Sequence, residues 1–130
     1  MLTREDVRSL FEHLKSDPDQ FFAHVATDVQ WTVMGTHPLA GIYQSKEDFL
    51  DHTFKRLAKI LKEGALLEIV DLFIDGSTAI VEMRSISTAN NGKPFDNRYC
   101  WIVTFSGDLI TAVKAYLDSA LVQQLVSENE

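Results

Sequence analysis

Glycine-containing turns divide the second half of the chain into four segments in which apolar and other side chains alternate. These segments cover about 66–75, 78–89, 95–106 and 109–117. The pairs Asp75-Gly76, Asn91-Gly92 and Gly107-Asp108 separate them, and such pairs are typical of tight hairpin turns. A side-chain period of two indicates strands. The second half is therefore predicted to be a meander of four antiparallel strands.

The first half of the chain shows helical spacing around one short strand. Apolar residues recur every three or four positions after Thr3, and a second short helix is expected from Asp17-Pro18. Residues 29–33 alternate as a strand, and Ser45 begins a long helix that Gly64 ends. A last short helix is expected from residue 118, with Asp118 as its N-cap. Helices followed by an antiparallel sheet indicate an α+β fold with the helices on one face.

Composition limits the classes of function. Residues 1–130, with 45% hydrophobic and 24% charged side chains, predict a single domain with a real core. The net charge of −7 argues against a nucleic-acid partner. No apolar run is long enough for a membrane span, and Cys100 alone excludes an intramolecular disulfide. We expect a cytoplasmic protein without a membrane partner.

Two charged residues interrupt an otherwise apolar strand face. In the segment 78–88, the alternation places Glu82 and Arg84 on the side of Ile80 and Ile86. Opposite charges in such a position must be paired, solvated in a cavity, or exposed to water. One interpretation makes Arg84 an anchor for a carboxylate or enolate oxygen and Glu82 a base or the partner that orients it. The other is a structural ion pair at a cavity mouth.

The next strand repeats this mixture of polar and apolar residues. Asn97, Tyr99 and Trp101 share one side with Val103 and Phe105. Polar groups gathered on apolar strand faces favour a small-molecule pocket with a phenol donor, an amide and a stacking wall. Core packing alone is the other interpretation of these three side chains, since buried Tyr and Trp usually find partners.

The opposite side of the predicted sheet is also apolar. The residues assigned to it are Val81, Met83, Cys100, Ile102, Ile110, Ala112 and Tyr116. In an antiparallel sheet with one face in water, apolar and polar side chains alternate more regularly than they do here, and no helix is left to cover that side. We expect a homodimer packed through the outer sheet face, with an exposed apolar face as the alternative.

Four stretches carry a family resemblance. They are Trp31 through Gly35, Pro38 through Tyr43, Asn91 through Tyr99, and Tyr116-Leu117-Asp118. With the order of elements, they resemble the SnoaL-like, ketosteroid-isomerase-related branch of the nuclear transport factor 2-like superfamily. The resemblance implies a cystatin-like cone, in which N-terminal helices pack on a curved antiparallel sheet that encloses a pocket. It does not fix the activity, because the superfamily includes isomerases, cyclases, hydrolases, dehydratases and binding modules.

Two chemistries of the superfamily do not match this sequence. The Arg-Asp pair of limonene-epoxide hydrolase falls on Glu82 and Arg84 in reversed order, and its second Asp falls on Ala115, which disfavours epoxide hydrolysis. Ketosteroid isomerase needs a carboxylate base on the first strand, but residues 30–37 contain no acid. The pocket residues implied by the match and the strand parity are Trp31, Val33, Glu82, Arg84, Asn97, Tyr99, Trp101, Val113, Ala115 and Leu117, and we add Phe54 as a ligand-binding candidate.

These residues predict a pocket for a small apolar molecule with a polar oxygen, and no cofactor. The favoured function is an isomerase-, cyclase- or dehydratase-like enzyme that uses proton transfer. Glu82 or His37 would be the base, and Arg84 or Tyr99 would stabilise negative charge. For His37 the alternative is a surface histidine without a role. A non-catalytic binding module and a dimeric interaction domain with a filled cavity are the alternative functions.

No metal site is expected, because His13, His24 and His52 lie on separate helical segments without paired ligand spacing.

Overall fold

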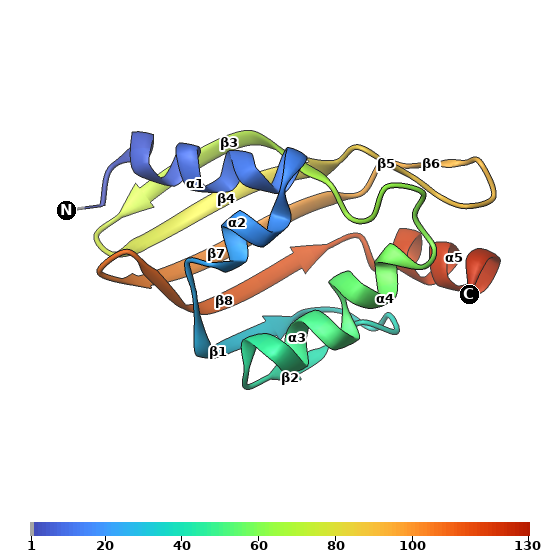
Figure 1. Ribbon diagram of the computed structural model, residues 1–130, viewed down its shortest axis with the longest axis horizontal. Coiled ribbons are helices and arrows are strands. Elements are labelled where there is room, and N and C mark those ends of the chain that lie inside the picture. The colour runs from blue at the N-terminus through green and yellow to red at the C-terminus, as the bar shows by residue number, and fades with distance from the viewer. Residues whose placement is uncertain (1) are drawn as a thin grey trace.

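The structure, a computed structural model, describes residues 2–130 and consists of five helices and eight strands (Figure 1). In chain order they are α1 (Arg4–Ser16), α2 (Pro18–Phe22), β1 (Val25–Val33), β2 (Gly41–Tyr43), α3 (Lys46–His52), α4 (Phe54–Ala58), β3 (Leu67–Asp75), β4 (Thr78–Ser85), β5 (Ser87–Thr88), β6 (Pro94–Phe95), β7 (Arg98–Ser106), β8 (Leu109–Leu117) and α5 (Ser119–Asn129). Within this part of the chain, no helix is both long and apolar enough to span a membrane.

Six strands form one curved sheet in the order β2-β1-β8-β7-β4-β3. The predicted meander is present as β3, β4, β7 and β8, and neighbouring strands within it are antiparallel. β1 pairs with β8 in parallel and with β2 in antiparallel fashion, so the sheet is mixed rather than purely antiparallel. Helices α1 and α3 pack on β3 and β1 respectively, on the side of the sheet nearer the viewer in Figure 1. The α+β cone is therefore confirmed.

Side-chain caps fix where the helices begin. The hydroxyl of Thr3 accepts a hydrogen bond from the backbone N–H of Asp6, and that of Ser45 accepts one from Asp48. The predicted long helix is interrupted at Thr53, whose φ of −124° and ψ of −82° are not helical. There the Thr53 hydroxyl donates to the carbonyl of Phe49 at 2.7 Å. The helix predicted from Ser45 therefore consists of two short helices, α3 and α4.

The register of β4 and β7 decides which side chains face the helices. Val81 lies opposite Trp101, and Met83 lies opposite Tyr99. Residues directly opposite on neighbouring strands point to the same face, and all four belong to or pack against the buried core. Glu82 therefore lies on the other face, with Cys100 as its partner.

Three residues assigned to the outer face lie in the core instead. Val81 and Met83 are buried because the inward set of β4 has the parity opposite to that expected. Ile110 is buried because a bulge between Thr104 and Phe105 shifts the pairing by one residue. The outward parity of Cys100, Ile102, Ala112 and Tyr116 agrees with the strand pairing, in which none of them lies opposite a core residue.

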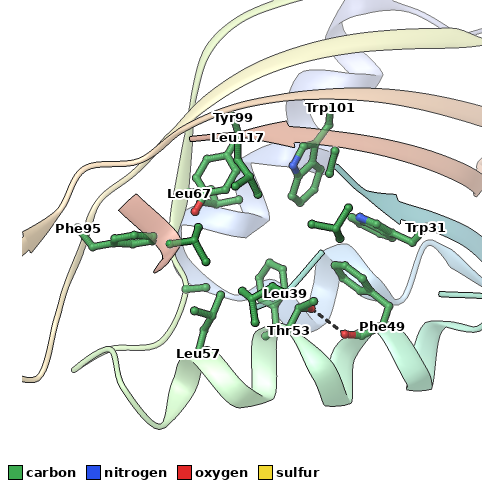
Figure 2. A pocket seen from close by; sticks show the side chains of 15 residues that line it. Trp31, Leu39, Phe49, Thr53, Leu57, Leu67, Phe95, Tyr99, Trp101 and Leu117 are labelled. Atoms are coloured by element: carbon green, nitrogen blue, oxygen red, sulfur yellow. Dashed lines mark hydrogen bonds between the residues drawn. The ribbon is translucent and has the colours of Figure 1, made fainter. Parts of the chain in front are cut away.

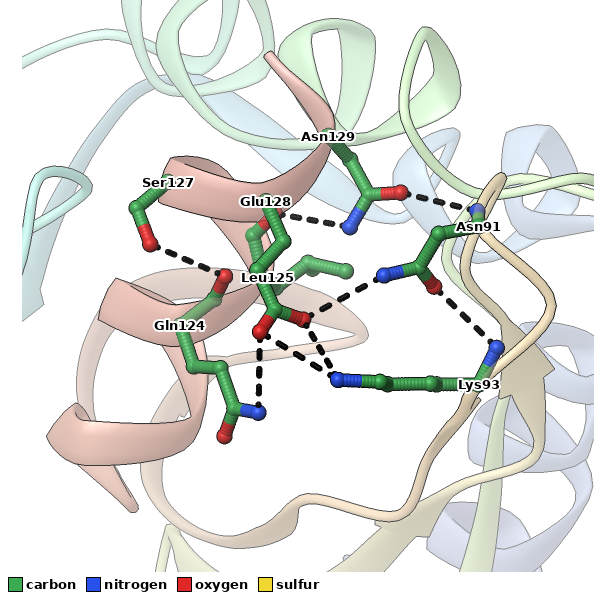
Figure 3. Close-up of polar contacts among 7 residues, drawn as sticks. All are labelled: Asn91, Lys93, Gln124, Leu125, Ser127, Glu128 and Asn129. Carbon is green, nitrogen blue, oxygen red and sulfur yellow. Dashed lines mark hydrogen bonds and ion pairs between the residues drawn. The ribbon is translucent and has the colours of Figure 1, made fainter.

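A second apolar cluster closes one end of the cone. It consists of Leu39, Leu57, Ile60, Leu61, Ala89, Phe95, Val122, Leu125 and Val126. These residues come from the loop before β2, from α4 and the turn that follows it, from the β5–β6 hairpin and from α5. Polar contacts fix that hairpin to α5: Glu128 accepts hydrogen bonds from Asn91 and Lys93, and the Asn129 side chain accepts one from the Asn91 backbone (Figure 3).

Candidate ligand pocket

A cavity of about 40 Å³ lies between α3, α4 and the inner face of the sheet (Figure 2). It is lined by Trp31, Val33, Leu39, Phe49, Thr53, Phe54, Leu57, Ala65, Leu67, Phe95, Tyr99, Trp101, Ala115, Leu117 and Val122. Since one water needs about 10–15 Å³, the cavity has room for only a few waters. A larger ligand has to displace side chains, and those of Phe54 and Leu117 are only half-buried.

Aromatic rings form the deep wall of the pocket. Trp31 stacks on Phe49 with ring centroids 3.9 Å apart and an angle of 17° between the planes. Trp101 meets Trp31 edge-on at 5.1 Å, and Phe22 packs on Phe54 at 5.0 Å. Such contacts hold large, rigid apolar surfaces in place. The wall is therefore a rigid, preformed apolar surface.

Three of the side chains that line the cavity carry a polar group. The Nε1–H of Trp31 is fully buried and has no acceptor among residues 2–130. Figure 2 shows this nitrogen on the ring edge that faces the other pocket side chains. Thr53 donates its hydroxyl hydrogen to Phe49, so that its oxygen is left as an acceptor. Tyr99 supplies the third group, a phenol.

The phenol of Tyr99 is held in its neutral form. Burial raises its pKa well above the usual value, and the amide of Asn97 only partly opposes this effect. Part of the ring remains accessible, but the hydroxyl itself lies deep. Among the lining residues that the structure describes, Tyr99 is the one ionisable group. No group of three or more His, Cys, Asp or Glu within 2–130 is arranged to hold a metal ion.

Seven of the residues that the sequence assigned to a pocket line this cavity. They are Trp31, Val33, Phe54, Tyr99, Trp101, Ala115 and Leu117. Val113 points inward but is packed in the main core below the cavity. Strand parity predicts the six positions on β1, β7 and β8, because these strands alternate regularly at this level, whereas Phe54 lies on α4.

Glu82 and Arg84 are not part of the pocket. Both are exposed on the outer face of the sheet. Arg84 donates its Nε–H to Glu68 on β3 at 2.5 Å, and no ion pair within residues 2–130 joins it to Glu82. The expectation that this pair enters the cavity is therefore wrong. The apolar Ile80 and Ile86 suggested the inward parity, but Ile80 faces outward opposite Ile102, and Ile86 lies beyond the end of β4.

Asn97 has a structural position rather than a place on the pocket wall. It is fully buried, and its side-chain oxygen accepts hydrogen bonds from the backbone N–H groups of Arg98 and Asp118, at 2.8 and 3.1 Å. Its Nδ2 donates to the Asp118 carbonyl at 3.4 Å. Asp118 itself caps α5, accepting from Ala120 and Leu121, as predicted. The amide thus joins the start of β7 to the start of α5.

His37 is buried beside the pocket without lining it. Its Nδ1 accepts the backbone N–H of Leu39 at 3.2 Å, so that Nε2 carries the hydrogen and donates to the carbonyl of Met34 at 3.0 Å. Burial lowers the pKa of His37, and the Met34 carbonyl opposes the shift. Both nitrogens are engaged within the loop. They hold Leu39 against the cavity. His37 is therefore neither placed as a base in the pocket nor a surface histidine, as the two interpretations of the sequence had expected.

Several lining residues had no predicted role at a site. Phe49, Thr53 and Leu57 lie in the segment expected to be one long helix, and none of them was assigned to the pocket. Leu39, Phe95 and Val122 reach the cavity from the second apolar cluster, which is built by separate segments of the chain. These contacts depend on long-range packing, for which the sequence carries no local signal.

Comparisons with known proteins agree with this fold. The SnoaL-like domain matches residues 7–113. The dimerizing cyclase phiC of a fungal species is 26% identical over 128 residues, and the dimerizing cyclase tstC of Talaromyces stipitatus is 24% identical over 128. Each match covers 95% of this chain and 57% of the cyclase, so the chain spans little more than half the length of these curated relatives.

A solved structure gives the same picture of the fold. The nuclear transport factor 2-like protein of Burkholderia thailandensis superposes with a TM-score of 0.78 at 26% identity, covering 94% of this chain and 95% of the other. The domain match extends from α1 into β8 and thus covers most of the chain. The chain belongs to the SnoaL-like domain family.

Proposed function

We propose that this protein binds a small apolar molecule with a polar oxygen and acts on it as a cyclase- or isomerase-like enzyme. The observation that carries the proposal is the apolar pocket whose ionisable lining group, among the residues described, is the neutral phenol of Tyr99. The naming of two relatives as cyclases supports the reaction class.

The chemistry follows from a neutral donor on an apolar wall. The phenol of Tyr99 donates a hydrogen bond to the substrate oxygen, and this bond strengthens as negative charge develops there. The rigid walls of Trp31 and Phe49 hold the carbon skeleton in a reactive shape. Tyr99 thus stabilises the negative charge that develops on the oxygen, and solvent water accepts the α-proton, because no side chain lining the pocket within residues 2–130 is a base.

Proton exchange of a simple ketone tests this activity. Cyclohexanone in D₂O would exchange its α-protons faster with the protein than without it, as NMR follows directly. Tyr99→Phe is expected to slow the protein-dependent exchange by about 10²-fold, the usual effect of losing one donor to a developing oxyanion. Exchange at the wild-type rate in Tyr99→Phe would refute the catalytic part of the proposal.

Binding is tested separately with N-phenyl-1-naphthylamine, a neutral apolar fluorophore. Ala65→Phe adds a ring at a half-buried position of the cavity lining and is expected to abolish the fluorescence increase. Ala112→Phe adds the same ring on the outer face and serves as the matched control. Equal binding by both variants would place the fluorophore elsewhere and refute the pocket.

The small volume of the cavity favours a second candidate function. At about 40 Å³, most of the cone is filled by its own side chains, and Phe54 and Trp101 are among them. A dimeric interaction domain needs no larger cavity. Absence of both fluorophore binding and proton exchange, together with a stable dimer, would favour this candidate.

We also propose that two copies pack through the outer sheet face. One row of paired residues crosses all six strands on this face: Ile42, Thr32, Lys114, Ile102, Ile80 and Phe73. Apolar side chains at both ends of the row are exposed, 63% of Ile42 and 50% of Phe73. A second copy with the same row would cover this band, in which Ile42, Ile102, Ile80 and Phe73 are the apolar members, as in isologous dimers.

Sedimentation velocity tests the dimer. Ile102→Lys, at the centre of the band, is expected to convert a dimer into a monomer at micromolar concentration. Ser106→Lys, exposed at the end of β7, is the control for added charge. A wild-type monomer would refute this part of the proposal without affecting the pocket.

A further inference from the structure

We infer that the indole N–H of Trp31 is the donor that selects the ligand, so that the pocket takes neutral ketones, aldehydes or esters in preference to hydrocarbons of the same shape. The inference rests on the proposed pocket and names the class of molecule that it accepts. It concerns the recognition of an oxygen rather than the reaction at that oxygen.

A buried donor without an acceptor is unusual in a folded protein. More than nine in ten buried polar groups are paired, and an unpaired one destabilises the fold. Trp31 is 0% exposed, yet its Nε1 has no hydrogen-bond partner anywhere in 2–130. The nitrogen belongs to a side chain that lines the cavity. An acceptor carried by a ligand would satisfy it.

The ring cannot turn to find another acceptor. One face is stacked on Phe49 at 3.9 Å, and Trp101 and Phe22 pack on it at 5.1 and 6.0 Å. The backbone of Trp31 is fixed as well, because it pairs with Tyr43 on one side and Val113 on the other. The donor is therefore held in one direction, which is the requirement for a preorganised recognition group.

The surroundings indicate that the ligand is uncharged. No Lys, Arg, His, Asp or Glu occurs among the lining residues described, so an ionised ligand would lose its hydration without gaining a counter-charge. The phenol of Tyr99 is a second neutral donor on the same wall. A neutral donor in an apolar cavity matches a lone pair of a carbonyl oxygen.

The two tryptophans make the inference directly testable. The chain contains Trp31 and Trp101 alone, so a ¹H–¹⁵N spectrum has two indole signals, and Trp31→Phe assigns them. The probes are cyclohexanone and methylenecyclohexane, which differ in the replacement of the oxygen by a CH₂ group. Cyclohexanone should move the Trp31 indole proton downfield and bind at least about tenfold more tightly than methylenecyclohexane.

The Trp31→Phe variant should lose this preference, binding both probes within about twofold. If this variant does not fold, the inference is tested by the shift of the Trp31 indole signal of the wild type with each of the two probes. Equal binding of the two probes to the wild type, with the Trp31 signal unmoved by the ketone, overturns the inference and leaves the pocket intact. If neither probe moves the methyl signals of Val33 and Leu117, the pocket and the inference both fail.

Discussion

Arg84 donates its Nε–H to the carboxylate of Glu68, 2.5 Å away on the neighbouring strand. Lys15 of α1 approaches the other oxygen of the same carboxylate at 3.7 Å. The hydrogen bond from Arg84, with a smaller contribution from Lys15, lowers the pKa of Glu68. This group of charges fastens the edge strand β3 to β4 and to α1. It lies outside the pocket.

This arrangement predicts that Glu82→Gln and Arg84→Met leave ligand binding unchanged. Both positions are exposed on the outer face, away from the cavity. Titration with N-phenyl-1-naphthylamine measures the effect, and the affinity of each variant should equal that of the wild type. A tenfold loss in either variant would return the pair to the functional site.

Arg84→Met should also change how the free energy of unfolding depends on pH in acid. The folded-state pKa of Glu68 is lowered, so the stabilisation is present above the unfolded pKa and is lost as pH falls through the folded value. Without Arg84 the pKa of Glu68 should be lowered less, so this carboxylate should contribute less to the fall in unfolding free energy in acid. Urea unfolding between pH 6 and pH 3 measures it, and Arg98→Met is the control on the same face, since Arg98 pairs with Asp96 instead.

Tyr99 predicts a change at high pH. Its folded-state pKa is raised, mainly by burial, so the stabilisation is complete below the unfolded pKa of about 10 and is lost as pH rises toward the folded value. Tyr99→Phe should therefore show a flatter decline of unfolding free energy above pH 10. Tyr43→Phe should flatten it as well, since burial also raises the pKa of Tyr43. An unchanged slope in both variants contradicts the burial of these phenols.

Much of the fold could be predicted from the sequence because its signals are local. The caps at Thr3, Ser45 and Asp118 and the hairpin turns at Gly76 and Gly107 all act over a few residues. The order of the meander follows from them. The place of β1 beside β8 depends on a parallel pairing across some eighty residues, and no local pattern in the sequence encodes it.

The candidate site was only partly predictable for a related reason. Parity placed Trp31, Tyr99 and Trp101 on the correct face, because each strand alternates regularly there. It failed for Glu82, where β4 has apolar residues on both faces and only the register with β7 decides which face is inside. Polar residues on an apolar strand indicate a cavity only once the inward face is known.

His37 predicts a loss of stability in mild acid. Its folded-state pKa is lowered by burial, so the unfolded chain takes up protons first, and stability falls as pH drops from about 6.5 toward the folded value. In His37→Asn the side-chain oxygen can still accept the Leu39 N–H but does not titrate. Between pH 7.5 and pH 5.5, the urea midpoint of the variant should therefore fall less than that of the wild type.

His52→Gln is the control for replacing a histidine, because His52 is exposed on α3 and lies outside the loop of His37. Protonation of His37 would also release Leu39 from the cavity wall, so the affinity for N-phenyl-1-naphthylamine should change with pH in the wild type and not in His37→Asn. An identical pH dependence of the midpoint in His37→Asn and wild type would contradict the assignment.

Asn97 predicts a link between stability and the pocket. Asn97→Ala removes the acceptor for the backbone N–H groups of Arg98 and Asp118 in a fully buried position, and the free energy of unfolding should fall by about 1–3 kcal/mol. Because Asp118 begins α5, which carries Val122 to the cavity wall, fluorophore binding should weaken as well. Asn90→Ala is the matched control: Asn90 is exposed, and a surface change of this kind stays within about 0.5 kcal/mol. Equal unfolding free energies for the two variants would show that the amide of Asn97 does not hold α5 in place.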